Sequence, residues 1–336
     1  MNRNLSIDNF VIFKWVMRFV DGFMRSQSVP IYYFISGFVF FLGVKEFTKS
    51  VYFKKLKNRF HSLFIPYIIW NTVALLMLIF FSMPMFSSLY SNGEFMPSLH
   101  GFLSCYWAFD KSYLFKTASL GITSPVNVPL WFLRDLMIVV LCTPILYKLL
   151  KWLKYYFVIA IGAIWVGNAF FNFDPMDFTS AFFFFTWGAY MSINNKDMIK
   201  YFGRFFSASM ILYPVLSISY MVLMHFAPQY AFIAKQANII AGLLFAYNSA
   251  VWLLKNNRCK VNQFLASSSF FIYVTHILIC NKLQKLMLYV LKPQTDLTIL
   301  AVYVAALLIT LAILLTTFRL MRQYTPNLLR VVTGRK

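Results

Sequence analysis

The chain has 336 residues, of which 60% are hydrophobic and only 12% are charged, and its formal net charge is +21. Ordinary globular domains carry about 25% charged residues, so this composition excludes a soluble domain of the usual kind. In a soluble protein so much positive charge would indicate a nucleic-acid partner. In a membrane protein, basic loops instead orient the helices and contact anionic lipid. We therefore predict an all-α, polytopic membrane helix bundle with no nucleic-acid partner.

The N-terminal segment, residues 1–28, does not read as a membrane span. Residues 10–24 are apolar, with Lys14 and Arg18 one helical turn apart, which is typical of a helix lying in the membrane interface. The segment also lacks the apolar core and cleavage site of a signal peptide. We interpret it as an interfacial helix or the remnant of a larger N-terminal element.

The rest of the chain offers nine candidate membrane spans. Such a helix needs about 20 mostly apolar residues. The candidates are 29–44, 62–83, 129–150, 155–172, 178–193, 206–226, 231–254, 264–281 and 297–318. We assign all of residues 1–336 to one membrane domain, in which residues 84–128 form the longest connection.

Lys and Arg are concentrated in alternate connections. Twenty of them lie in residues 45–60, 148–154, 194–204, 255–260 and 319–336, and six lie in residues 84–128, 173–177, 227–235 and 282–296. Because Lys and Arg near membrane segments stay on the cytoplasmic side, the first set and the C-terminus are predicted to be cytoplasmic. The loop 84–128 is then extracytoplasmic. Nine helices also place the basic N-terminus outside, against the same rule, and one further helix upstream would remove that conflict.

The chain carries none of the familiar soluble-enzyme or metal motifs. Its four cysteines have no CxxC spacing, so we predict neither a zinc site nor a redox pair. It has no P-loop, no Gly-x-Ser-x-Gly elbow and no His-Glu-x-x-His motif.

Four segments nevertheless carry recognisable patterns. They are Val29–Phe38 (VPIYYFISGF), Arg59–Trp70 (RFHSLFIPYIIW), Pro129–Leu136 (PLWFLRDL) and Ser269–His276 (SFFIYVTH). In this order, and at these topological positions, they resemble the helix motifs of the integral-membrane acyltransferase-3 family, the bacterial membrane O-acyltransferases. The resemblance covers residues 29–318. It implies an enzyme of the bacterial inner membrane that acylates a hydroxyl of a cell-envelope glycan or lipid-linked sugar.

The same resemblance implies the donor and marks one departure. The donor is expected to be acyl-CoA on the cytoplasmic side, most commonly acetyl-CoA, acting as a substrate and not as a permanently bound cofactor. The family pattern has ten helices, and its first helix carries an arginine and a catalytic histidine. This chain has no histidine before His61. The expectation is therefore either a start upstream of residue 1 or a protein without that catalytic helix.

His276 is the first candidate for chemistry, because an ionisable group at membrane depth usually faces the bundle interior or a water-filled cavity. We predict that it acts as general base on an acceptor hydroxyl. The alternative is a neutral histidine bonded to a neighbouring helix. Arg134 is the second catalytic candidate, and with Asp135 it could bind a polar group of donor or acceptor. The alternative for this pair is snorkelling to the headgroups around a local ion pair.

The remaining candidate residues are predicted to bind substrates. Lys55, Lys57 and Arg59 lie at the cytoplasmic mouth and could bind the phosphates of acyl-CoA, or they could only orient the helices. Candidate substrate-binding residues are Trp131, Tyr273, Ser36 and His100. A nucleophilic role for Ser36 is disfavoured, because no histidine lies nearby in sequence to activate it. His100 belongs to an outer loop rich in aromatic and polar residues, which suits either a carbohydrate contact or a simple lid.

Two other functions stay open at this point. One is a non-catalytic membrane protein that assists polysaccharide export, which the missing first helix would explain. The other is a secondary transporter, although ion-coupled transporters generally need ionisable groups near the midplane. Of the ten acidic residues, only Asp135 falls inside a predicted span, and it lies near the end of that span.

Overall fold

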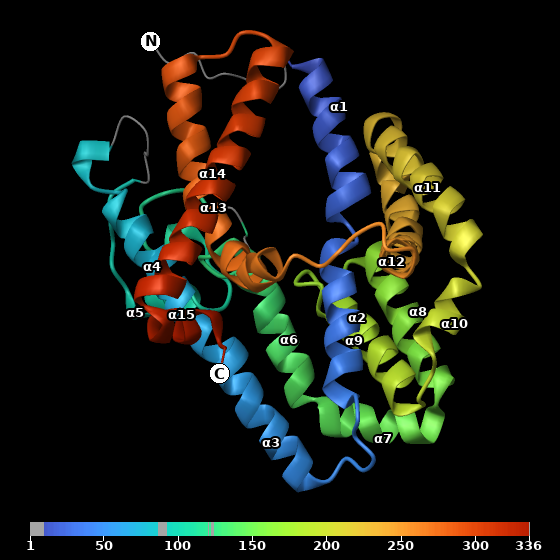
Figure 1. Cartoon of the computed structure of the whole chain (residues 1–336). Coiled ribbons are helices and arrows are strands. Elements are labelled where there is room, and N and C mark those ends of the chain that lie inside the picture. The colour runs from blue at the N-terminus through green and yellow to red at the C-terminus, as the bar shows by residue number, and fades with distance from the viewer. Residues whose placement is uncertain (1–9, 87–92, 120, 122–123, 336) are drawn as a thin grey trace. The chain divides into compact units, whose positions relative to one another are not determined.

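The computed structural model describes residues 10–86, 93–119, 121 and 124–335. Across these residues the secondary structure is helical, apart from one isolated bridge between Phe95 and Phe115. This confirms the predicted all-α class. The chain divides into two compact units (Figure 1). Unit 1 comprises residues 1–52 and 139–261, and unit 2 comprises residues 53–138 and 262–336. The assignment of the whole chain to one membrane domain stays a prediction.

Unit 1 is built around two helix pairs, α2 with α9 and α11 with α12. Its helices are α1 (Val11–Val20), α2 (Ser28–Phe41), α7 (Thr143–Leu153), α8 (Tyr155–Phe171), α9 (Phe178–Ile193), α10 (Met198–Gly203), α11 (Phe206–Phe226) and α12 (Ala231–Lys255). Aromatic side chains fill the space between them, as where the ring of Trp165 stacks on that of Phe183 with centroids 5.1 Å apart.

Helices α2 and α9 touch through their backbones at two glycines. A Cβ atom on Gly37 would lie 2.0 Å from the carbonyl oxygen of Phe185, and one on Gly188 would lie 2.0 Å from the carbonyl oxygen of Phe34. Small residues allow this close approach between membrane helices. The Ser36–Gly37 break in the aromatic run of α2 therefore marks a helix crossing.

Residues 11–20 of the N-terminal segment form helix α1, as predicted, and this helix packs against α11. Between α1 and α2 the helix widens into a π turn, Asp21–Arg25, which leaves backbone carbonyls for side chains to bind. Asn238 of α12 donates to the carbonyl oxygen of Gly22 at 2.7 Å and accepts a hydrogen bond from Ser217 of α11 at 3.0 Å. Polar side chains from two long helices thus hold the π turn in place.

Unit 2 contains three long helical stretches and a loop whose described part is folded. Its helices are α4 (Ile65–Phe80), α5 (Leu99–Ser104), α13 (Gln263–Leu291), α14 (Asp296–Tyr324) and α15 (Pro326–Thr333), and it shares α3 (Lys49–Arg59) and α6 (Trp131–Leu141) with the boundary of unit 1. A π turn, Phe60–Phe64, joins α3 to α4, so residues 49–80 form one long helix. The expectation that residues 45–60 form a loop is therefore wrong for most of that segment, because residues 49–59 are helical, whereas its cytoplasmic side stays a prediction.

Helices α13 and α14 form a tight hairpin (Figure 1). Asn262 caps α13 by accepting hydrogen bonds from the backbone of Phe264 and Leu265 at 3.0 and 3.1 Å. The helix ends at Lys292, whose φ of 44° is left-handed, and Thr295 then caps α14. The connection predicted over residues 282–296 is thus too long, because α13 continues to Leu291.

The predicted span 129–150 is broken: α6 and α7 meet at an angle of 63°. Proline at position 144 cannot donate a hydrogen bond to the carbonyl oxygen of Val140, four residues earlier. The hydroxyl of Thr143 donates to that oxygen instead, at 2.7 Å. The proline therefore accounts for the bend within residues 129–150, and their assignment as one span stays a prediction.

Five helices of the described residues are long and apolar enough to cross a membrane, or six if the bent α6–α7 pair is one span. The five run over residues 49–80, 206–226, 228–255, 263–291 and 296–324. Helices α2, α8 and α9 have 14, 17 and 16 residues and are shorter than a typical span. The multi-pass membrane architecture holds, and the count of nine spans stays a prediction.

Candidate functional site

A buried ion pair lies at the start of α6. The Nε atom of Arg134 is 2.8 Å from Oδ1 of Asp135, and the two side chains are only 3% and 0% exposed. A second guanidinium nitrogen, Nη1, donates to the carbonyl oxygen of Trp107 at 2.6 Å, and the guanidinium also lies 5.3 Å from the centre of the Trp107 ring. The local ion pair of the second alternative is therefore present, whereas the burial of both side chains argues against snorkelling to the headgroups.

Arg134 anchors the predicted outer loop, which is compactly folded. Within that loop, Cys105, Phe109, Leu114 and Phe115 form a buried apolar cluster with Leu75 of α4. Tyr67 of α4 donates to the carbonyl oxygen of Tyr106 at 2.5 Å, next to the carbonyl that Arg134 binds. Burial raises the pKa of the Cys105 thiol to about 12, so this cysteine stays protonated and packs as an apolar group.

Two buried asparagines join α4, α6 and α13. Asn71 accepts a hydrogen bond from the backbone N–H of Asn127 at 3.2 Å, and the Asn127 amide donates to the carbonyl oxygen of Val274 at 2.9 Å. Asn71 follows the Pro-Tyr-x-x-Trp pattern and Asn127 precedes the Pro-Leu-Trp pattern, so both stand beside family-like motifs. The sequence analysis missed them, although amides beside such motifs were a usable signal.

His276 lies near the middle of α13, where its tautomer is set by the helix itself. Its Nδ1 atom is 2.8 Å from the carbonyl oxygen of Tyr273 and 3.1 Å from that of Ile272. Carbonyl oxygens only accept hydrogen bonds, so Nδ1 carries a proton, and in the neutral imidazole the lone pair is then on Nε2. The half-buried imidazole thus presents a proton acceptor on Nε2.

Tyr273 supports the same stretch of α13. Its hydroxyl donates to the carbonyl oxygen of Pro129, and its ring meets that of Phe132 edge-on with centroids 6.0 Å apart. The motif segments 129–136 and 269–276 are therefore in direct contact. This contact brings Tyr273 together with the start of α6, whose first residue is the half-buried Trp131.

The three predicted donor-binding residues separate into two groups on α3. Lys55 and Arg59 are one helical turn apart and half-buried, so they share a face. Lys57 is exposed and lies two residues from each of them, which turns it to another side of the helix.

Two predicted substrate-binding residues stand apart from this arrangement. His100 is exposed at the start of α5, and its ring packs edge-on against Tyr113 with centroids 4.9 Å apart. Ser36 is half-buried on α2, in unit 1.

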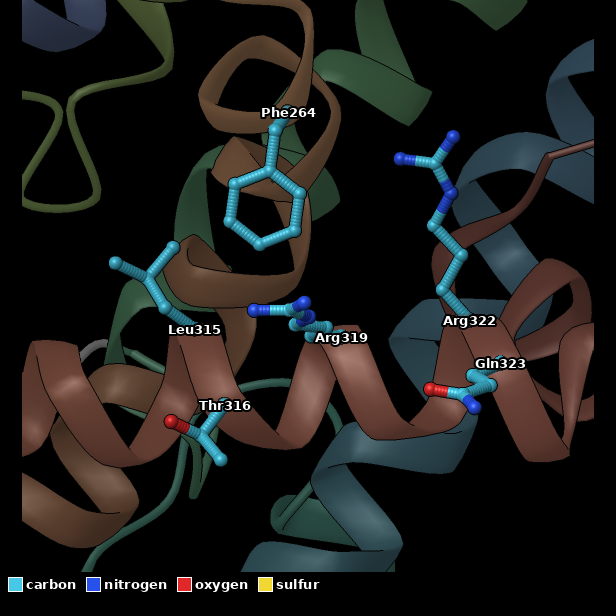
Figure 2. Close-up of a pocket in the computed structure, with 6 residues that line it drawn as sticks. All are labelled: Phe264, Leu315, Thr316, Arg319, Arg322 and Gln323. Atoms are coloured by element: carbon cyan, nitrogen blue, oxygen red, sulfur yellow. The ribbon is translucent and has the colours of Figure 1, made fainter.

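A cavity of about 610 Å³ opens along the last turns of α14 (Figure 2). It is lined by Phe264, Leu315, Thr316, Arg319, Arg322 and Gln323. Figure 2 shows Arg319 beside Leu315 and below Phe264, with Arg322 further along the helix. Sequence analysis treated both arginines only as orienting charges. The cavity combines two guanidinium groups with an apolar wall, which suits an anionic, partly apolar ligand.

Among the described residues, no three His, Cys, Asp or Glu side chains gather as a metal site would require. All four cysteines are free thiols.

The comparisons with known proteins identify the family. The acyltransferase-3 family, whose description is an acyltransferase domain, matches residues 3–319. The chain belongs to this family. It is also 23% identical over 337 residues to the succinoglycan biosynthesis protein ExoH of Rhizobium meliloti (strain 1021), covering 98% of this chain and 84% of that protein. No solved structure matches the chain significantly.

Membership of the acyltransferase-3 family decides between the functions that the sequence left open. This acyltransferase is a multi-pass membrane enzyme that transfers acyl groups other than amino-acyl groups. A secondary transporter is disfavoured on the same ground. The buried Asp135 agrees with this result, since its carboxylate is engaged by Arg134 within its own helix.

Proposed function

We propose that the acyltransferase moves an acyl group, most commonly acetyl, from cytoplasmic acyl-CoA to a hydroxyl of a cell-envelope polysaccharide or its lipid-linked precursor. The similarity to a succinoglycan biosynthesis protein supports a polysaccharide acceptor. The distribution of Lys and Arg supports an inner-membrane location with a cytoplasmic C-terminus. The observation that carries the chemistry is the tautomer of His276, whose Nε2 is left as a proton acceptor.

In this mechanism Nε2 of His276 takes the proton of the acceptor hydroxyl as the hydroxyl oxygen attacks the thioester carbonyl carbon. A C–O bond forms, the C–S bond breaks, and the coenzyme A thiolate leaves. The imidazolium then returns its proton to the thiolate, so the products are an O-acyl ester and a free thiol. The carbonyl oxygens of Tyr273 and Ile272 hold Nδ1–H throughout, and they favour the imidazolium as it forms.

Arg134 has a different part in this proposal. The sequence predicts it as a catalytic residue, and that assignment stays a prediction. Its contacts with Asp135 and Trp107 support a positioning role, in which it fixes the folded outer loop against α6. Tyr273 and Trp131 stand at the same end of α6 and are the best placed of the predicted acceptor-binding residues.

Two sets of cationic side chains are candidates for the donor phosphates. Lys55 and Arg59 share one face of α3, and Arg319 and Arg322 line the cavity at the end of α14. Both sets lie in segments that the charge pattern assigns to the cytoplasm. Lys57, on another side of α3, would add only long-range attraction.

The first test is acyl transfer by purified full-length protein carrying His276→Gln, with His61→Gln as the matched control. His61 is an exposed histidine in the π turn before α4. Loss of a general base lowers the rate by about 100-fold or more, so we expect that loss for His276→Gln and a wild-type rate for the control. A His276→Gln variant as fast as wild type would remove the base from this mechanism.

Measuring KM for acyl-CoA distinguishes the two candidate donor sites. We expect Arg59→Gln or Lys55→Gln, or else the double variant R319Q/R322Q, to raise this KM by about tenfold, since charge-assisted hydrogen bonds are worth about 1.5–3 kcal/mol. Lys148→Gln, in another predicted cytoplasmic connection, is the control for net charge. An unchanged KM in every variant would contradict a phosphate site at either place.

A further inference from the structure

Three lysines gather at one small cavity in unit 2, whose lining also includes Ile277, the residue after His276. Lys111 comes from the folded loop, and Lys282 and Lys285 come from α13, one turn apart. The cavity has a volume of about 240 Å³. Pockets that enclose whole drug-sized ligands measure about 300–1,000 Å³, so this one suits a headgroup better than a complete molecule.

The lysines are placed where their charges interact strongly. Lys111 and Lys282 are half-buried, and Lys285 is exposed at the rim. The Nζ atom of Lys282 lies 4.4 Å from the centre of the Phe81 ring, which fixes the ammonium group over an aromatic face. Burial lowers the pKa of Lys111, and the positive charge of Lys285 lowers it further. Like charges in a partly desolvated pocket repel each other, and an anion seated between them lowers the free energy of all three.

Most of the remaining lining forms an apolar wall. Helix α4 contributes Ala74, Met77 and Leu78 to it, and the other apolar lining residues are Phe109, Pro125, Val126, Val128, Ile277 and Leu278. A small inorganic anion gains nothing from such a wall, whereas burying a hydrocarbon chain there is worth about 0.8 kcal/mol for each CH₂ group. The pairing of three ammonium groups with an apolar wall therefore selects an amphiphile with an anionic head.

We propose that Lys111, Lys282 and Lys285 bind the phosphate group of a membrane lipid whose apolar chain lies along α4. Lysine ammonium groups are common phosphate ligands. All three lysines belong to connections that the charge pattern assigns to the extracytoplasmic side. Two lipids share this chemistry: an isoprenoid phosphate that carries the sugar acceptor, and an anionic phospholipid. The first rests on the proposed function, because it supplies the glycan to the same enzyme.

The test is native mass spectrometry of the full-length protein in detergent with four probes: undecaprenyl phosphate, undecaprenol, phosphatidylglycerol and inorganic pyrophosphate. We expect undecaprenyl phosphate to bind at least about tenfold more tightly than undecaprenol or pyrophosphate, since only it offers both the charge and the chain. Tighter binding of undecaprenyl phosphate than of phosphatidylglycerol assigns the site to the sugar carrier. The reverse order assigns the site to a structural phospholipid, and either order supports a lipid-phosphate site.

The variants identify the residues. K282Q/K285Q should weaken binding of the preferred lipid by about tenfold or more, and Lys282→Arg, which keeps the charge, should restore most of it. The matched control is K116Q/K292Q, which removes two lysines from the same loop and helix outside this cavity. Equal binding of undecaprenol, equal binding of pyrophosphate, or an unaffected K282Q/K285Q variant would each overturn the proposal. Because no acyl donor is present, these results are independent of whether acyl transfer itself is demonstrated.

Discussion

Each of the two units of this acyltransferase is stabilised internally by a different set of interactions. Unit 1 relies on backbone contact at Gly37 and Gly188 and on aromatic stacking, with its buried amides bound mainly to backbone. Unit 2 buries a charged pair, Arg134 and Asp135, and contains His276 and the three-lysine cavity. An ion pair stabilises less reliably than apolar packing of the same volume. We propose from this comparison that unit 1 serves as a scaffold, whereas unit 2 retains costly polar groups for function.

The largest expected effect is on the ion pair of unit 2. Asp135→Ala leaves the guanidinium of Arg134 buried without its carboxylate, which costs about 3–5 kcal/mol. The measurement is thermal unfolding of the purified protein. The double variant R134M/D135L removes both charges and should recover most of that loss. If Asp135→Ala were as stable as wild type, the proposed difference between the two units would be wrong.

A smaller loss of stability is expected for a substitution in unit 1. Gly188→Ala places a Cβ atom 2.0 Å from the carbonyl oxygen of Phe34, so α2 and α9 must move apart. Overpacking of this kind costs about 1–3 kcal/mol, and more where backbone has to shift. Gly203→Ala is the control, because its added Cβ meets no heavy atom within 4 Å. Equal stability of the two variants would show that α2 and α9 do not depend on their close approach.

The next prediction concerns the loss of one hydrogen-bonded side chain, Asn238, at the π turn of unit 1. Asn238→Ala removes the donor to the carbonyl oxygen of Gly22 and the acceptor for Ser217. Leaving such buried groups unsatisfied costs about 1–3 kcal/mol. Asn256→Ala, at an exposed position after α12, is the control. Faster protease cleavage near residues 21–25 in the Asn238 variant alone would locate the loss at the π turn.

The smallest expected effect depends on pH. Asp177 is exposed, but partial desolvation by its surroundings raises the pKa of its carboxyl to about 6, although Lys235 opposes the shift. Because the unfolded pKa is near 3.9, the folded state holds the proton more tightly. Stability therefore falls as the pH rises from about 4 to about 6. Asp177→Asn should be slightly more stable than wild type at pH 7, and melting curves should converge below about pH 4. Asparagine also suits the φ of 57° at this position. Parallel curves at every pH would contradict the shift.

It was easier to predict from the sequence which segments carry the family motifs than how those segments are placed in the fold. The charge pattern and the four motif segments led to the right fold class and family, since both are carried by order along the chain. The depth of Arg134 was missed because a position near a helix end suggests snorkelling, whereas the folded loop covers that end. The kink at Pro144 was also missed, although a proline inside a predicted span was a visible signal. Lys282 and Lys285 were counted as loop charges because α13 continues to Leu291, about three turns beyond the span that was predicted to end at residue 281.

The packing of α15 has practical consequences. Its last turn packs on α4: the indole N–H of Trp70 donates to the carbonyl oxygen of Val332 at 2.8 Å, and a Cβ atom on Gly334 would lie 2.4 Å from the carbonyl oxygen of Ser62. A reporter fused directly behind this helix would therefore press on a packed surface. Topology mapping by C-terminal fusion needs a flexible linker, and clipping even the last turn removes a partner of a family-like tryptophan.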